Sequence, residues 1–192
     1  MASQEIWLVR HGETEWSRDH RHTSTTDLPL TSEGEQVARR LAEPLARDFA
    51  LVLTSPMRRA RDTAALAGHG TAVVDPDLKE WGYGDYEGIT TEEIRESVPG
   101  WTVWTHPSPG GESAEQVTER LDRVVTRLRG VEGDCLVFGH GHALRALTAR
   151  WLELPVTDGR HFRLDTATTC VLGFERETPV VLRWNTPAHA HP

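Results

Sequence analysis

Short apolar runs alternate with amphipathic segments along most of the chain, and no other feature narrows the fold as far. The runs that predict strands are 6–9, 50–54, 71–75, 135–138, 169–174 and 180–184. Helical periodicity occupies the intervening segments 31–47, 58–67, 113–128 and 143–152. This alternation is typical of α/β proteins, in which helices cover both faces of a sheet. We therefore expect a three-layer α/β/α sandwich with a mostly parallel central sheet.

Two of the expected helices carry signals at their starts. Ser113 and Gln116 have the spacing of a capping box, and they precede an apolar stripe that runs from Val117 to Leu128. Ser32 and Glu35 offer the same spacing at the start of segment 31–47. Pro44 lies within that segment and should kink or shorten the helix, because proline lacks the amide donor.

The middle of the chain, residues 79–112, is rich in glycine, tryptophan and proline. It predicts one short helix, at 91–96, and is otherwise loop. A long loop-rich stretch inside a compact domain is more often functional than idle. A chain of 192 residues fits one domain. We predict a single domain, 1–192, with 79–112 as a small loop-rich cap.

Composition excludes several classes of partner. The formal net charge of −8 is unfavourable for binding nucleic acid. The longest apolar run, Phe49–Leu53, is far shorter than the roughly 20 residues of a membrane span. Charged residues near the N-terminus leave no signal-peptide core. Cys135 and Cys170 form no disulfide framework and indicate a reducing compartment, so we expect a cytoplasmic protein.

The final strands offer an edge for a possible homodimer.

Polar side chains follow the expected strands where these strands end. Ligands of open α/β sheets bind beyond the carboxyl ends of the strands. The residues at these ends are Arg10, His11, Gly12, Arg59, Glu80 and His140. Because parallel strands share one carboxyl edge, we expect these side chains to lie together. Buried cations without partners are costly, so the cluster should bind something anionic.

Residue chemistry suggests a role for each of these side chains. Arg10 and Arg59 carry planar, charged forks that match phosphate oxygens. A neutral imidazole at His11 can attack phosphorus and form a phosphohistidine. His140 can donate to the transferring oxygens, and Glu80 can protonate the leaving alcohol and later deprotonate water. The predicted chemistry is phosphoryl transfer by positioning and electrostatics.

Protein cations alone can neutralise the phosphoryl group in this scheme, so we expect neither a metal nor another cofactor. A glycine at position 12 lets the backbone approach the phosphate. One alternative remains, because six of the ten histidines form His-x-His pairs, a spacing that also fits a metallohydrolase. These pairs are His20/His22, His140/His142 and His189/His191. No carboxylate-rich ligand set accompanies them, so His142 is better interpreted as pocket wall or helix start. His22 is a candidate for the pocket through the loop that bears Thr23.

Seven stretches of the chain, taken in order, resemble the histidine phosphatase superfamily, which includes phosphoglycerate mutases. They are Arg10–Trp16, Thr31–Gly34, Ser55–Ala64, Leu78–Glu80, Gly84–Gly88, Gly111–Ser113 and Gly139–His142. The resemblance implies that His11 becomes phosphorylated and that Glu80 is the acid/base. It also implies that Arg10, Arg59 and His140 belong to the catalytic pocket. Ser17 and Ser24 depart from the family pattern, which has asparagine and glycine there.

Some segments are similar to a narrower branch of this family. Residues 16–17, 26–31, 80–88 and 139–145 resemble small sugar-phosphate phosphatases such as sedoheptulose bisphosphatases, and 101–113 resembles actinobacterial acid phosphatases of broad specificity. The resemblance implies a small phosphorylated metabolite as the substrate. The predicted phosphate- or substrate-binding residues are Arg10, Gly12, Ser17, Thr23, Ser24, Arg59, Glu80, Tyr83, His140, Gly141 and His142.

The segment between Glu80 and His140 looks short beside that of the mutases. A smaller cap admits water, which favours hydrolysis over transfer. We therefore predict a metal-independent phosphoric monoester hydrolase of the acid phosphatase type. The alternatives are a phosphoglycerate mutase-type transferase and a non-catalytic phospho-ligand binder.

Several conspicuous side chains have a plainer interpretation. Arg58 and Arg61 are expected to be solvated charges on a helix face. Trp7 and Trp151 are interpreted as core residues. Core packing is also the favoured interpretation of the aromatic residues of the loop-rich middle, although they can alternatively form a lid. These residues are Trp81, Tyr83, Tyr86, Trp101 and Trp104.

Overall fold

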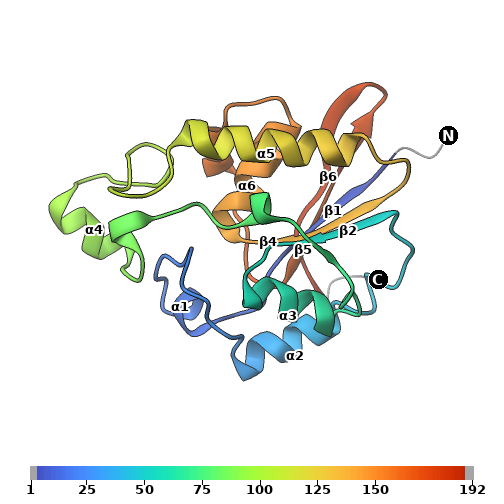
Figure 1. Cartoon of the computed structure of the whole chain (residues 1–192), viewed down its shortest axis with the longest axis horizontal. Coiled ribbons are helices and arrows are strands. Elements are labelled where there is room, and N and C mark those ends of the chain that lie inside the picture. Colours follow the sequence, from blue (N-terminus) through green and yellow to red (C-terminus); the bar gives the residue numbers. More distant parts are fainter. Residues whose placement is uncertain (1–3, 189–192) are drawn as a thin grey trace.

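A computed structural model describes residues 4–188, which build a six-stranded sheet with the order β3-β2-β4-β1-β5-β6 (Figure 1). The strands are β1 (Ile6–Arg10), β2 (Leu51–Thr54), β3 (Val73–Val74), β4 (Cys135–Gly139), β5 (Thr168–Glu175) and β6 (Thr178–Pro187). The first four strands are mutually parallel, and β5 pairs antiparallel with both β1 and β6. The prediction of a mostly parallel central sheet is confirmed.

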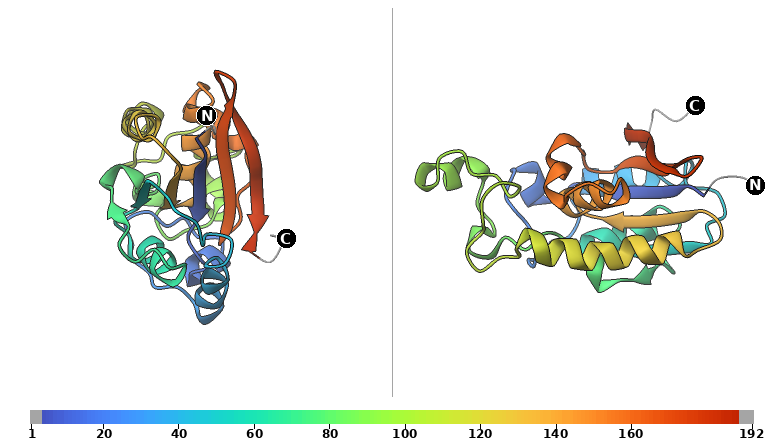
Figure 2. Two further views of the ribbon diagram at one scale, coloured as in Figure 1. Left: turned by 90° about the vertical axis from the view of Figure 1, so that its right-hand side faces the viewer. Right: turned by 90° about the horizontal axis from the view of Figure 1, so that it is seen from above.

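Helices cover both faces of this sheet, which confirms the three-layer prediction. The α-helices are α1 (Glu15–Arg18), α2 (Ser32–Arg40), α3 (Arg58–Leu66), α4 (Thr91–Ser97), α5 (Ala114–Arg129) and α6 (Gly141–Trp151). Short 3-10 turns are η1 (Pro76–Leu78), η2 (Gly84–Tyr86) and η3 (Val156–His161). In Figures 1 and 2, α5 and α6 lie on one face, α2 and α3 lie on the other, and α4 projects away at one end.

Alternate residues of the central strands point to opposite faces, and both faces are buried. Ile6 and Leu8 pack with the apolar stripe of α5, whereas Trp7 and Val9 pack in a second cluster on the α2–α3 face. The stripe, Val117, Leu121, Val124 and Leu128, is buried as expected. This double burial explains why β1 is continuously apolar in sequence.

Two local predictions at helix α2 met different outcomes. The helix ends at Arg40, and turns occupy the residues before and after Pro44, so the predicted shortening is confirmed. The Ser32–Glu35 capping box is wrong, because the cap lies one residue earlier. Thr31 Oγ1 accepts from Gly34 N at 3.0 Å, and Glu35 pairs instead with Arg39.

Other boundaries follow the sequence more closely. The Ser113–Gln116 capping box is present, with both reciprocal hydrogen bonds formed. Segment 71–75 contributes only Val73–Val74 to the sheet, and both valines are 48% exposed. β3 is short because it lies at an edge and pairs with β2 alone.

Segment 79–112 holds η2, α4 and irregular chain, arranged around buried aromatic rings. Trp81, Tyr83, Trp101 and Trp104 belong to the core cluster on the α5–α6 face, which confirms the core interpretation. Tyr86 is partly buried and packs edge-on against Trp101, with 5.2 Å between ring centroids. The assignment of a single domain with this segment as its cap stays a prediction.

Three predictions concern surroundings rather than fold. Within residues 4–188, no helix is long and apolar enough to span a membrane. β6 forms an outer strand of the sheet, and a homodimer across it stays a prediction. A cytoplasmic location also stays a prediction. The His189/His191 pair lies outside the described residues.

Candidate active site

The carboxyl ends of β1 and β4 bring two imidazoles together. Arg10 is the last residue of β1, and the His11 amide continues the β1–β4 ladder by donating to Gly139 O at 3.0 Å. His140 follows directly after β4 and is the N-cap of α6. The ring centroids of His11 and His140 are 5.2 Å apart. Parallel pairing of the two strands therefore places residues far apart in sequence at one rim.

His11 is held as a neutral imidazole with one free nitrogen. Its Nδ1 lies 2.7 Å from Gly12 O, and a carbonyl can only accept, so Nδ1 carries the proton. Burial, followed by the charges of Arg59 and Arg10, holds the pKa of His11 well below its usual value. The side chain lines a cavity. Nε2 therefore has an available lone pair next to two cations.

Arg10 is a partly buried cation whose hydrogen bonds are incomplete. Nη1 donates to Leu164 O at 2.6 Å, whereas Nε is buried and has no hydrogen-bond partner among residues 4–188. The guanidinium lies against Gly141, where an added Cβ would come 3.3 Å from Arg10 Cζ. Burial lowers the pKa of Arg10, although the charge of Glu80 acts in the opposite direction. A buried, unsatisfied donor atom on a cation is a feature of an anion site.

Arg59 and His140 are fully buried, and neither is among the residues that line the cavity. Arg59 Nε donates to His140 Nδ1 at 3.2 Å, so the other nitrogen of His140 carries the proton, and Ser55 Oγ lies 2.6 Å from it. Burial, and then the charge of Arg59, holds the pKa of His140 well below its usual value. The Arg59 Nη atoms donate to the carbonyls of Thr23, Ser24 and Thr26. Arg59 therefore anchors the 23–26 loop in this arrangement.

Glu80 is held at the N-terminus of α6. Its Oε1 accepts from Ala143 N at 2.7 Å and from Trp81 N at 2.9 Å, and Oε2 accepts from His142 N at 3.1 Å. Helix N-termini offer free amide donors and a positive dipole end, which suit a carboxylate. Glu80 also lines the cavity, so α6 presents this carboxylate to the ligand side.

The cavity beside His11 has a volume of about 240 Å³. Its charged lining comprises Arg10, Arg21, Arg145 and Glu80. The remaining lining residues are His11, Ser17, His20, His22, Thr23, Tyr83, Thr91, Gly141, His142 and Leu164. The cavity is therefore positive within a protein whose net charge is −8. This local sign fits a small anion and is compatible with the overall acidic balance.

Five further predicted binding residues line this cavity: Ser17, Thr23, Tyr83, Gly141 and His142. The candidate His22 is confirmed as a lining residue. Gly12 and Ser24 are not in its lining. Ser24 is buried and binds Glu87 through both its amide and its hydroxyl.

The structure explains the need for glycine at position 12 differently from the sequence prediction. A Cβ at this position would come 2.6 Å from Gly34 O, and the Gly12 amide donates to Thr63 Oγ1 at 2.9 Å. Close packing of two backbone segments therefore requires the glycine. Its predicted part in substrate binding stays a prediction.

Neutral rings form one wall of the cavity. Tyr83 Oη lies 2.6 Å from His142 Nδ1, and burial raises the pKa of Tyr83 well above its usual value, so the phenol donates. His22 stacks near Tyr83, with 4.7 Å between ring centroids, and burial lowers the pKa of His22 to about 4. Trp101 and Trp104 pack behind these rings. The wall offers ring faces and uncharged polar atoms.

Sequence reasoning missed several contributors to the site. Arg145 lies three residues after His142 on α6, a spacing that places both on one helix face and could have indicated it. Arg21 and Thr91 reach the cavity through loop and cap contacts that leave no sequence signal. Glu87 accepts from the amides of Ser24 and Thr26 and so fixes the 23–26 loop. In the described part of the chain, no three His, Cys, Asp or Glu side chains are grouped to hold a metal.

A family model of the histidine phosphatase superfamily, branch 1, matches residues 6–187. The chain belongs to this superfamily, as its motifs predicted. Its relatives include an acid phosphatase of Mycobacterium tuberculosis, 44% identical over 91% of this chain and 89% of the relative. A sedoheptulose 1,7-bisphosphatase of Saccharomyces cerevisiae is 37% identical over 78% of this chain and 68% of the relative.

The solved structures agree with this assignment. An open-reading-frame product of Mycobacterium tuberculosis matches with a TM-score of 0.93 at 41% identity, over 97% of this chain and 99% of that one. A mycobacterial glucosyl-3-phosphoglycerate phosphatase in complex with VO3 matches with a TM-score of 0.85 at 29% identity, over 95% and 99%. The predicted class, a phosphoric monoester hydrolase, is confirmed by these relationships.

Proposed function

We propose that this protein hydrolyses small phosphomonoesters through a phosphohistidine on His11, with Glu80 as general acid and base. The observation that carries the proposal is the free Nε2 lone pair of His11 in a cavity where Arg10 retains an unused donor. A neutral imidazole next to fixed cations is a competent nucleophile for a phosphate ester. No metal or other cofactor takes part in the proposed steps.

In the first step, His11 Nε2 forms a bond to phosphorus as the bond from phosphorus to the ester oxygen breaks. Glu80, in its protonated form, gives its proton to the departing alkoxide, and an alcohol leaves. In the second step, Glu80 takes a proton from water while the water oxygen attacks phosphorus. The bond from phosphorus to Nε2 then breaks, which releases inorganic phosphate and restores His11.

Arg10, Arg59 and His140 are the proposed phosphate-binding residues. Arg10 Nε has no competing partner among residues 4–188, so it is free to donate to the phosphate. Arg59 Nη2 is shared between the carbonyls of Thr23 and Ser24, at 3.2 Å each. A phosphate dianion is a stronger acceptor than a carbonyl, so we expect it to compete for this donor.

Sugar phosphates and related metabolites are the proposed substrate class. The cavity is small, and its wall of neutral rings suits hydroxyl-bearing carbon chains. The names of two relatives, a sedoheptulose bisphosphatase and a glucosyl-3-phosphoglycerate phosphatase, support this class. A screen of metabolite phosphates, ranked by kcat/KM, would identify the preferred substrate.

The mechanism is tested by trapping the intermediate. Turnover of 4-nitrophenyl phosphate is quenched in alkaline denaturant, because phosphohistidine is labile in acid, and the intact mass is measured. We expect an added phosphoryl group on the wild-type protein and none on the His11→Ala variant. Full activity of that variant without a phosphorylated species would overturn the proposal. Loss of activity in EDTA that only added metal restores would favour a metallohydrolase.

The low pKa of His11 also defines an expected pH profile. Because burial and two arginines disfavour the imidazolium, His11 stays nucleophilic below pH 7. Glu80 must be protonated in the first step, which also favours acid conditions. We expect an acidic optimum for kcat/KM. A profile that peaks above pH 8 would contradict this assignment of roles.

A mutase is the second candidate, because proteins named probable phosphoglycerate mutase are 29% identical over 94% of this chain. It predicts interconversion of 2- and 3-phosphoglycerate with little release of phosphate. An enolase-coupled assay run beside a phosphate assay separates transfer from hydrolysis. Tight phosphate binding without turnover of any ester would instead favour the non-catalytic binder.

A further inference from the structure

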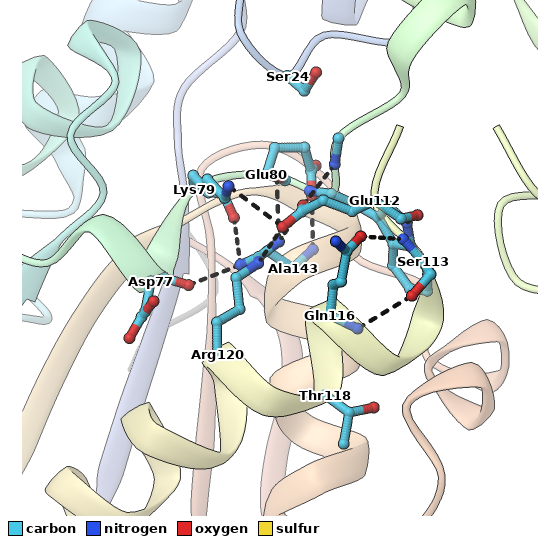
Figure 3. Close-up of polar contacts among 12 residues, drawn as sticks. Ser24, Asp77, Lys79, Glu80, Glu112, Ser113, Gln116, Thr118, Arg120 and Ala143 are labelled. Carbon is cyan, nitrogen blue, oxygen red and sulfur yellow. Dashed lines mark hydrogen bonds and ion pairs between the residues drawn. The ribbon is translucent and has the colours of Figure 1, made fainter. Parts of the chain in front are cut away.

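Glu80 lies on irregular chain between η1 and η2, where no helix or strand fixes the main chain. We infer that Arg120, together with Glu112, is a positioning residue that holds Glu80 in place for proton transfer. Arg120 projects from α5 toward the main chain of Asp77 and Lys79 (Figure 3). The inference rests on the proposed acid/base role of Glu80, and the experiment below separates the two.

Arg120 replaces the missing secondary structure with a set of carbonyl contacts. Nη1 donates to Asp77 O at 2.7 Å and to Lys79 O at 2.9 Å, and Nη2 donates to Glu80 O at 3.3 Å. The side chain is almost fully buried. One planar guanidinium therefore binds the carbonyls of the two peptide groups that flank the Glu80 Cα. A lysine ammonium cannot reproduce this fork.

Glu112 completes the arrangement from the far end of segment 79–112. Its carboxylate accepts from Arg120 Nε at 2.9 Å and from Nη2 at 3.0 Å, and Oε2 also accepts from Gly82 N at 2.8 Å. Burial alone raises the pKa of Glu112, but Arg120 and the Gly82 amide outweigh it and leave the pKa below its usual value. The Glu112 main chain binds Gly82 O and the Trp81 indole. The residues on both sides of Glu80 are thus fixed.

These contacts determine where the Glu80 carboxylate can lie. Its main chain is fixed by α5 through Arg120, and its oxygens are fixed by the first amides of α6. Proton transfer requires hydrogen-bond distance to the ester oxygen, so a displacement of about 1 Å is costly. Arg120 is not in the cavity lining, so it acts through Glu80 without touching the substrate.

Leaving-group dependence distinguishes positioning from a structural role. A general acid matters for an alkoxide leaving group and matters little for an acidic phenol. We compare kcat/KM for ribose 5-phosphate, 4-nitrophenyl phosphate and 2,4-dinitrophenyl phosphate in wild type, Arg120→Lys, Glu112→Gln and Glu80→Gln. kcat/KM reports the first chemical step, in which Glu80 donates its proton. Active enzyme is counted by the burst of dinitrophenolate.

Arg150→Lys is the matched control. Arg150 also binds a carboxylate through two nitrogens, Nε and Nη2 to Asp122, and donates from Nη1 to the carbonyl of Leu154. It links α6 to α5 away from Glu80. We expect this variant to have the wild-type ratio of kcat/KM values across the three esters.

For Arg120→Lys we expect kcat/KM to fall about 30-fold for ribose 5-phosphate and less than threefold for the dinitrophenyl ester, within the range of general-acid effects. Glu112→Gln should give the same pattern with a smaller fall, and it serves if the lysine variant does not fold. Equal falls for all three esters in both variants would overturn the inference while leaving Glu80 intact. If Glu80→Gln itself shows no leaving-group dependence, the role of Glu80 fails, and the inference fails with it.

Discussion

Arg10, which is partly buried, and Arg120, which is buried, differ in how fully their guanidinium groups are satisfied. Arg120 contacts a carboxylate and three carbonyls, and each of its three nitrogens has a partner. Arg10 contacts one carbonyl, its Nε has no partner, and the ion pairs within residues 4–188 do not include it. Both side chains come from regular elements that meet near the cavity.

This difference distinguishes an arginine that stabilises the fold from an arginine that binds a ligand. Burying a cation without a partner is unfavourable, so an unsatisfied guanidinium is retained where a ligand completes it. The Arg120 guanidinium is satisfied by chain outside the cavity lining, so it fixes that chain and does not bind the ligand. Arg10 should therefore matter for turnover and little for stability, and Arg120 should matter for both. The predictions that follow test this contrast.

The largest effect is expected at the proposed nucleophile, His11. His11→Ala should lower kcat/KM by about 10⁴-fold or more, because no other group supplies the covalent route. The free energy of unfolding should stay within about 1 kcal/mol of wild type, since among residues 4–188 the ring makes one hydrogen bond, to the adjacent carbonyl. Steady-state assays and urea unfolding check both values. Activity within tenfold of wild type would remove His11 from the mechanism.

Arg10→Gln tests the unsatisfied arginine. We expect kcat/KM to fall about 10² to 10³-fold, because a charged donor to the transferring oxygens is lost. Stability should be unchanged or slightly higher, since a partly buried cation with an unsatisfied Nε is removed. The control is Arg58→Gln, at an exposed residue of the α3 surface whose side chain pairs with Asp62, and this variant should retain activity. A large loss of stability in Arg10→Gln would contradict the contrast drawn above.

Arg120→Met tests the satisfied arginine from the side of stability. Removing it leaves the partly buried Glu112 carboxylate with only the exposed ammonium of Lys79 and leaves three carbonyls without their donor, so the free energy of unfolding should fall by about 3 kcal/mol. The double variant Arg120→Met/Glu112→Leu should recover part of this loss, because no unpaired charge remains. A double-mutant cycle from urea denaturation measures the coupling. Additive effects would show that the two side chains act independently.

The sequence predicted the elements that local pattern determines. Apolar runs such as Ile6–Val9 and the stripe Val117–Leu128 identified strands and helices, because burial of one face leaves a period. The rim was also predictable, since parallel strands place His11 and His140 at the same end. What failed locally was fine register, as at the α2 cap, where Thr31 and Ser32 are equally good caps by type.

The rest of the site depends on three-dimensional packing that sequence does not show. Nothing in the pattern indicated that Arg59 would bind the carbonyls of the 23–26 loop, or that Glu87 would fix that loop from the middle of the chain. The pair Arg120–Glu112 was missed for the same reason. Arg120 lies within a helix that is amphipathic by sequence. Only the tertiary fold shows that the guanidinium of Arg120 contacts the carbonyl of Glu80.

The pH dependence of stability differs between the region of Arg10 and the region of Arg120, because imidazoles titrate in the first and a carboxylate titrates in the second. Unfolded imidazoles bind protons below about pH 6.5, whereas buried His11 and His140 stay neutral to a lower pH. The unfolded state then binds more protons, so stability falls as pH falls below 6.5, by about 1.4 kcal/mol per pH unit for each imidazole. Glu112, whose pKa is lowered, adds its own loss only below about pH 4.5.

Urea unfolding between pH 7 and pH 5 therefore reports the catalytic region. His11→Ala should reduce the slope of stability against pH in this window, and Glu112→Gln should leave that slope unchanged. A slope of zero for the wild type would contradict the burial of neutral imidazoles.

The smallest expected effect is stabilisation by inorganic phosphate. Phosphate at five times its dissociation constant should stabilise the wild type by about 1 kcal/mol, which corresponds to a rise in Tm of about 2–4 °C. Arg120→Lys should show the same shift in Tm, because residue 120 does not line the cavity in which phosphate binds. Arg10→Gln should lose the shift. Sulfate is tested at the same ionic strength as phosphate, and chloride at that ionic strength is the reference. This comparison controls for salt effects on the surface. An equal shift in all three proteins would place phosphate away from Arg10, and the unsatisfied donor would then need another ligand.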